Sequence, residues 1–165
     1  MNAGADRDDR KLPLGQLATS ELLKGFPVVI DWPVQWGDQD ALGHVNNTVY
    51  FRWCESARVA YLQRLGLAAW LNPTVLGPIL AQIECNYKRQ LHFPDSVLIG
   101  TRITRLGKTS LSMEHAIVSS AQNAIVAESS SVIVVFNYQT QRPALIPNEV
   151  RTAIEGLEGR MLADN

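Results

Sequence analysis

The pattern of hydrophobic and polar residues changes twice along the chain. Residues 26–36 form a largely apolar run of extended character, in which Pro27 and Pro33 restrict a strand to an edge or a terminal position. Residues 47–65 then follow a helical period, and their apolar side chains cover one broad arc of the helix. So wide an arc predicts a helix that its packing partners largely enclose.

The rest of the chain predicts mainly β-strands. Four strands are expected, at residues 79–90, 97–106, 111–120 and 124–137. Because the connections between them are too short for crossover helices, these strands are expected to form an antiparallel meander. A final amphipathic helix is expected after Pro147, with an apolar face formed by Val150, Ile154, Leu157 and Met161.

This order of elements predicts one domain of the α+β class. A sheet of about five antiparallel strands curls around one long buried helix, and a C-terminal helix is added. The 165 residues are enough to bury such a core. Residues 1–22 are polar and turn-rich and are expected to form a flexible arm, which leaves residues 23–165 as the domain. One face of the sheet needs cover or a partner, which predicts a symmetric homodimer that continues the sheet.

Composition and charge narrow the class of protein. Hydrophobic residues make up 46% of the chain and charged residues 19%, which is typical of a soluble globular protein. A net charge of -1 argues against nucleic acid or a membrane surface as the main partner, since both need a field of one sign. No apolar run approaches the roughly 18 residues of a membrane span, and the N-terminus has no signal-peptide pattern. A cytoplasmic protein is therefore expected.

Two cysteines, Cys54 and Cys85, are present and lack the spacing of a metal or redox motif. Neither a disulfide framework nor a zinc site is therefore expected. Both side chains are predicted to be small, buried and apolar in character.

The candidate chemistry is concentrated between the apolar run and the long helix. Residues 37–47 read Gly-Asp-Gln-Asp-Ala-Leu-Gly-His-Val-Asn-Asn, with two carboxylates, two glycines, a histidine and two asparagines. The segment leads directly into the helix N-terminus, where backbone N–H groups lack intrahelical partners. It is predicted to be an active-site loop.

This loop closely resembles the signature of the hotdog-fold acyl thioesterases of the 4-hydroxybenzoyl-CoA thioesterase type. The matching positions are residues 37–47, 85–89 and 95–98, together with Tyr50, Trp53, Glu55 and Arg58. The core from His44 to Asn47 is also similar to plant acyl-ACP thioesterases, although Leu42 stands where those enzymes have an asparagine. The resemblance spans about residues 28–140 and implies hydrolysis of acyl-CoA or acyl-ACP without a metal or prosthetic group, with coenzyme A as part of the substrate.

The resemblance also implies roles for the polar residues. Asp40 matches the family's catalytic carboxylate, a nucleophile or general base, with stabilisation of the loop or capping of the helix as its alternative. Asp38 is expected to be structural. The backbone N–H of Asn47, at the positive end of the helix dipole, is expected to polarise the thioester carbonyl, and Asn47 can also cap the helix. His44 matches a catalytic histidine of the plant enzymes, with loop packing as its alternative. Glu55 is a rival catalytic carboxylate, with a structural salt bridge as its alternative.

Binding of the substrate is expected to use basic and aromatic side chains. Arg89 and Lys108 belong to a group of basic residues near strand ends that can meet phosphate, although solvated strand-end charges explain that group equally well. Tyr50 and Trp53 are candidate walls of an acyl slot, as are Trp70 and Leu76, although a buried core uses such residues more often. The remaining members of the basic group are Lys88, His92 and Arg105. The remaining histidine, His115, is predicted to be a satisfied core residue.

Three functions remain open at this level. An acyl-CoA thioesterase is the leading hypothesis. A hotdog-type enoyl-CoA hydratase or dehydratase is the second, and a non-catalytic acyl-CoA-binding module is the third. The acyl chain, the carrier and the choice between a homodimer and a homotetramer are left open by the sequence.

Overall fold

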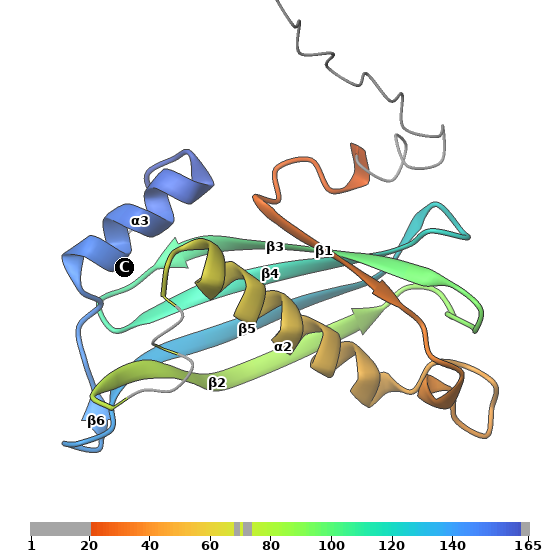
Figure 1. Ribbon diagram of the computed structural model, residues 1–165, viewed down its shortest axis with the longest axis horizontal. Helices are drawn as coiled ribbons and strands as arrows, with labels where there is room; N and C mark the ends of the chain where they lie inside the picture. The colour runs from red at the N-terminus through yellow and green to blue at the C-terminus, as the bar shows by residue number, and fades with distance from the viewer. Residues whose placement is uncertain (1–20, 68–69, 71–73, 163–165) are drawn as a thin grey trace, which may run out of the picture.

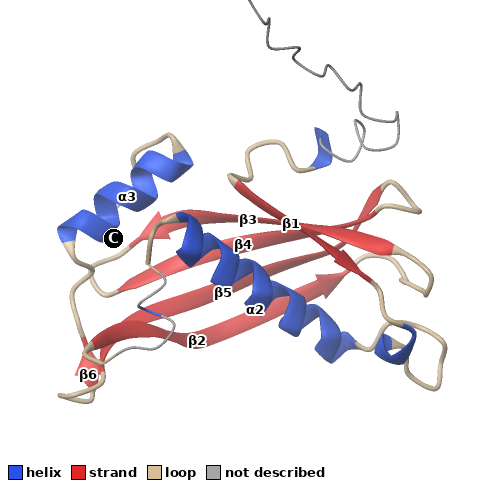
Figure 2. Cartoon of the chain, viewed as in Figure 1, coloured by secondary structure: helices blue, strands red, loops and turns tan. Residues whose placement is uncertain are grey.

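The computed structural model describes residues 21–67, 70 and 74–162, and this part forms one curved antiparallel sheet with a long helix, α2, across one face (Figure 1). The strands are β1 (Val28–Pro33), β2 (Leu76–Tyr87), β3 (Ser96–Leu106), β4 (Ser110–Ser119), β5 (Ala124–Asn137) and β6 (Arg142–Pro143). The helices are the short 3-10 helix η1 (Trp36–Asp38), α2 (Asn47–Arg64) and α3 (Asn148–Glu158). The expected α+β architecture is confirmed, with α2 and the sheet in two layers (Figure 2).

The strand order differs in one respect from the expected meander. Within the sheet the order is β1-β3-β4-β5-β2, with the short β6 paired to β5, so β2 lies beside β5 and not beside β3. Residues 88–95, which join β2 to β3, can span up to ~26 Å when extended, while crossing three strand spacings takes only ~14 Å. A short connection therefore excludes a crossover helix but does not force its two strands to pair.

The apolar face of α2 is buried as predicted. Its buried residues are Val49, Tyr50, Trp53, Cys54, Ala57 and Tyr61. Arg52, Glu55 and Gln63 are exposed on the opposite side. The helix is capped by Asn46, whose side chain accepts a hydrogen bond from the Thr48 N–H, and not by Asn47. Among the helices described, none is long and apolar enough to cross a membrane.

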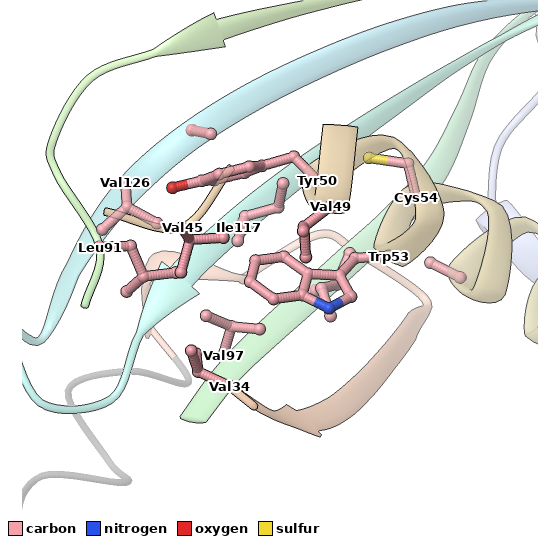
Figure 3. Close-up of a cluster of buried hydrophobic side chains, with 13 residues drawn as sticks. Val34, Val45, Val49, Tyr50, Trp53, Cys54, Leu91, Val97, Ile117 and Val126 are labelled. Atoms are coloured by element: carbon pink, nitrogen blue, oxygen red, sulfur yellow. The ribbon is translucent and has the colours of Figure 1, made fainter. Parts of the chain in front are cut away.

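The core beneath α2 consists of two apolar compartments. The first surrounds the N-terminal half of α2 and contains Trp53, Val97 and Ile117 (Figure 3). The second surrounds the C-terminal half and contains Tyr61 and Met113. Their separation follows from the strand register, because the row of residues between them is polar or small.

This polar row crosses four strands in register, from Cys85 on β2 through Ser129 on β5 and His115 on β4 to Thr101 on β3. The Nδ1 atom of His115 lies 2.9 Å from Thr101 Oγ1. His115 is buried as predicted, but its Nε2 atom has no hydrogen-bond partner among the described residues, so the prediction of a satisfied histidine is only half right. Cys54 is fully buried, whereas Cys85 is only partly so, and both thiols are free.

The C-terminal helix α3 closes the end of the second compartment. Glu158 accepts hydrogen bonds from the Tyr61 hydroxyl at 2.5 Å and from the Ile103 N–H at 2.6 Å, which joins α3 to both α2 and β3. The helix ends earlier than its apolar pattern predicted. Gly159 has a φ of 66°, the left-handed conformation that terminates helices, and Met161 beyond it is 82% exposed.

The segment before β1 packs on the face of the sheet opposite α2. Leu23 is buried against Ala116 and Val118. Gly100 on β3 permits this contact, because a Cβ atom there would lie 2.8 Å from both Leu23 and Phe26. Residues 1–20 of the expected arm lie outside the described residues.

Candidate active site

The loop before α2 is a small closed turn. Residues Gln39 and Val45 form an antiparallel bridge across it. At its tip, the Asp40 N–H donates to the His44 carbonyl at 2.9 Å, and the Gly43 N–H donates to the Asp40 carbonyl at 3.0 Å. Gly43 has a φ of 77°, a conformation that glycine adopts at no steric cost. The closed turn therefore holds Asp40 and His44 side by side.

Asp38 has the structural role expected of it. Its Oδ2 atom accepts a hydrogen bond from the Gln35 N–H at 2.8 Å, and its carbonyl accepts one from the Asn46 N–H at 2.8 Å. Its side chain is only 12% exposed and lies 3.6 Å from the Arg52 guanidinium. These contacts join the segment after β1, the loop and α2, so Asp38 is occupied in holding the loop.

Asp40 has few such contacts. One carboxylate oxygen, Oδ1, accepts the Leu42 N–H at 2.8 Å, as in an Asx-turn. The other has no hydrogen-bond partner among the residues that the structure describes, and the side chain is exposed. It faces a cavity of ≈ 360 Å³ lined by Asp40, His44, Val45, Asn47, Tyr50, Tyr87, Lys88, Arg89, Gln90 and Leu91. We call this the Asp40 cavity.

The N-terminus of α2 contributes a backbone donor to the same cavity. Asn46 caps the helix, accepting from the Thr48 N–H at 2.9 Å and from the Thr48 hydroxyl at 2.7 Å. Asn47 is therefore the first helical residue, and its N–H makes no hydrogen bond within the described chain. A polarised donor that remains free at a helix N-terminus suits an oxygen that gains negative charge.

Two tyrosines, Tyr50 and Tyr87, line the cavity. The Tyr87 hydroxyl donates to the Asn47 carbonyl at 3.1 Å, and its ring meets the Tyr50 ring edge-on with centroids 5.1 Å apart. Burial raises the pKa of both phenols to about 12, so both remain neutral hydrogen-bond donors at pH 7. Tyr87 was not among the predicted site residues, although it lies in the segment 85–89 that carried part of the family resemblance.

His44 lies beside a second histidine. The His44 and His92 rings form a T-shaped contact with centroids 4.9 Å apart. The His92 Nδ1–H donates to the Gly43 carbonyl at 2.9 Å, which ties the loop after β2 to the turn. His44 thus borders the Asp40 cavity while one side of its ring packs on His92. This geometry is compatible with a catalytic role and with a role in packing the loop.

The predicted site residues are only partly gathered in one chain. Arg89 lines the Asp40 cavity together with Lys88, which is paired with Glu128 at 2.7 Å. Lys108 lies in the turn between β3 and β4, at the opposite end of β3 from the loop that borders the cavity. Trp53 is buried in the first apolar compartment.

Glu55 is separated from Asp40 along the helix axis. Eight residues of α2 beyond Asn47 correspond to ~12 Å, and Glu55 lines two other cavities and not the Asp40 cavity. The predicted acyl walls Trp70 and Leu76 pack against the second compartment. Within residues 21–67, 70 and 74–162, no group of three or more His, Cys, Asp or Glu side chains is arranged to hold a metal ion.

Comparison with known proteins identifies the family of this chain. The family model of the thioesterase-like superfamily matches residues 34–154, which include the loop, α2 and the whole of β2 to β5. The long-chain acyl-CoA thioesterase FadM of Escherichia coli K12 is 24% identical over 116 residues, which cover 70% of this chain and 88% of FadM.

Solved structures show the same fold. A thioesterase from Thermus thermophilus, crystallised with coenzyme A and Zn, is 35% identical with a TM-score of 0.73, over 83% of this chain and 98% of that one. A thioesterase-superfamily protein from Jannaschia sp. CCS1 is 26% identical with a TM-score of 0.79, over 92% of this chain and 96% of that one. The chain therefore belongs to the thioesterase-like superfamily, and its sheet curved around α2 is the hotdog fold.

Proposed function

We propose that the protein hydrolyses acyl-CoA thioesters, with acyl-ACP as the alternative carrier substrate. The observation that carries this proposal is the Asp40 cavity, where a carboxylate oxygen and the first N–H of α2, both without partners in the described chain, border one space. Membership of the thioesterase-like superfamily and the named activities of FadM and the coenzyme A-bound Thermus protein support it.

The two groups divide the reaction between them. With the thioester oxygen against the Asn47 N–H, negative charge that develops on that oxygen is stabilised by the N–H and the helix dipole. Asp40 then either attacks the carbonyl carbon, giving an anhydride that water cleaves, or removes a proton from an attacking water. In both routes the C–S bond breaks, the thiol leaves with a proton, and the acid is released.

We assign the carrier arm to the rim formed by Lys88 and Arg89. The Arg89 side chain makes no hydrogen bond or ion pair with the described residues, whereas Lys88 is neutralised by Glu128, so Arg89 is the better partner for a phosphate.

A homodimer is part of this proposal. β2 lies at an edge of the sheet and, within the described chain, pairs only with β5, so its other side can continue the sheet in a second copy. The substrate would then lie between subunits. Light scattering of the purified protein should give twice the chain mass or, for paired dimers, four times; a monomer would contradict this part of the proposal.

A panel of acyl-CoA and acyl-ACP thioesters, followed with a free-thiol reagent, tests the reaction. Thiol release is expected from at least one of the two thioester classes. A mechanism based on Asp40 and the helix N-terminus alone predicts that this release persists after treatment with a chelator. No release from any thioester would overturn the proposal. Hydration of an enoyl-CoA without thiol release would identify a hydratase instead.

A further inference from the structure

A second cavity, of ≈ 270 Å³, lies between the C-terminal half of α2, the sheet and α3. Its walls are mainly apolar and include Leu62, Leu111, Ile133 and Ile154. It shares no lining residue with the Asp40 cavity, and the first apolar compartment of the core lies between the two. We call it the Arg58 pocket, after the cationic side chain in its wall.

The Arg58 guanidinium has no compensating partner within the described part of the chain. Its Nη1 atom is buried, and no hydrogen bond or ion pair joins Arg58 to any residue that the structure describes. Burial lowers the pKa of Arg58, and nearby Glu55 and Cys54 act in the opposite direction. Glu55 is exposed and forms no ion pair with it. A partly desolvated cation without a counter-charge is unfavourable, because the lost hydration is not replaced.

The other groups near Arg58 do not supply that counter-charge. The sheet beneath the helix offers His115 and Ser131, whose Nε2 and Oγ atoms are also buried without a partner in the described chain. The Ser131 hydroxyl is uncharged. His115 is neutral at pH 7, because burial and the Arg58 charge lower its pKa to about 3. The missing charge must come from outside this part of the fold.

A carboxylate is the chemical complement of such a group. A guanidinium binds carboxylate through two parallel N–H donors, more strongly than it binds a neutral acceptor. A cavity of 150 Å³ holds the six carbons of benzene, so the Arg58 pocket has room for roughly ten heavy atoms. We propose that the Arg58 pocket binds a medium-chain carboxylate, with the carboxylate at Arg58 and the alkyl chain toward Leu111 and Ile154.

Octanoate and 1-octanol, titrated calorimetrically into the full-length protein, test the proposal. They have the same apolar chain and differ mainly in the charge of the head group. Octanoate is expected to bind at one site per chain, at least tenfold more tightly than 1-octanol. Saturating coenzyme A is expected to leave octanoate binding unchanged, because the pocket is separate from the Asp40 cavity.

Two variants and one matched control locate the site. Arg58→Met should remove the preference for octanoate over 1-octanol but still bind 1-octanol. Arg64→Met, a change of the same kind on the exposed end of α2, should keep the preference for octanoate. Leu65→Trp should fill the pocket and abolish binding of both ligands, with unfolding midpoints measured for every variant. Each of four results would overturn the proposal. The first two are the absence of saturable octanoate binding and octanoate binding that survives Leu65→Trp. The other two are an unchanged preference for octanoate in folded Arg58→Met and displacement of octanoate by coenzyme A.

Discussion

The two ends of α2 lie in very different surroundings. At the N-terminal end, a closed turn and a backbone N–H without a partner in the described chain border a cavity that also holds an exposed carboxylate. At the C-terminal end, apolar side chains from the sheet and from α3 enclose a cavity with a partly buried guanidinium in its wall. Polar groups at the first end are held by backbone contacts of the loop, so they can carry chemistry without weakening the core.

The polar row explains how one sheet supports both ends. It crosses the sheet at the level of Arg58 and separates the two apolar compartments, so that each packs around its own half of the helix. Substitutions at the N-terminal end should therefore mainly change activity. Those in the row or at the C-terminal end should mainly change stability.

The largest effect is expected for Asp40→Asn. Loss of the carboxylate should lower kcat/KM for thioester hydrolysis by roughly 100-fold to 10,000-fold, the range typical of a removed general base. The unfolding midpoint should stay close to that of the wild type, because the Leu42 N–H can still donate to the amide oxygen. Asp31→Asn, an exposed carboxylate on β1, is the control and should retain full activity. An Asp40→Asn protein with the wild-type rate would exclude Asp40 from the reaction.

Acid should destabilise the fold through His115. Its pKa lies near 3 in the folded protein because of burial and, secondarily, Arg58, and near 6.5 in the unfolded chain, which therefore binds the proton first as the pH falls. The free energy of unfolding should be unaffected by this group above pH 6.5. Between pH 6.5 and pH 3 it should decrease as the pH falls, by up to ~1.4 kcal/mol per pH unit from this group. Urea unfolding at pH 7 and pH 4.5 should show a smaller acid loss for His115→Gln than for the wild type. Equal losses in the two proteins would contradict this assignment.

A smaller effect is expected where α3 is anchored. Tyr61→Phe removes the hydroxyl that donates to Glu158, and hydrogen bonds to charged groups contribute ~1.5–3 kcal/mol to stability. Tyr138→Phe is the matched control, because its hydroxyl makes only a long contact of 3.4 Å to the Pro78 carbonyl. Thermal unfolding should show a clear loss for Tyr61→Phe and little change for Tyr138→Phe, with thioester hydrolysis retained in both. Similar midpoints for the two variants would mean that the Tyr61 hydroxyl does not anchor α3.

The smallest effect is expected at the helix cap. Asn46→Ala should cost ~1 kcal/mol of stability, since the Thr48 N–H loses its acceptor. The rate should also fall, because the first turn of α2 presents the Asn47 N–H. Ser56→Ala, which removes an exposed hydroxyl contact within the same helix, should change neither. A fall in stability with an unchanged rate would argue against a catalytic role for the first turn.

Local pattern alone located most elements of this protein, although it placed the strand observed as β2 (Leu76–Tyr87) at residues 79–90 and did not predict β6. The helical period placed α2 to within a residue, and the turn residues placed β3, β4 and β5 almost as closely. The loop from Gly37 to Asn47 was recognisable because its glycines, carboxylates and asparagines lie in one continuous stretch. These features depend on neighbours in the chain, and the sequence contains them directly.

The tertiary structure decided which of these elements and residues meet. The pairing of β2 with β5, the contact of Tyr87 with the start of α2, and the separation of Glu55 and Lys108 from the Asp40 cavity all join or divide distant parts of the chain. The polar row, and an Arg58 that has no counter-charge among the described residues, likewise exist only once four strands are in register under the helix. Periodicity shows which face of an element is buried, but strand order and register depend on how the sheet closes around α2, and that is a property of the whole fold.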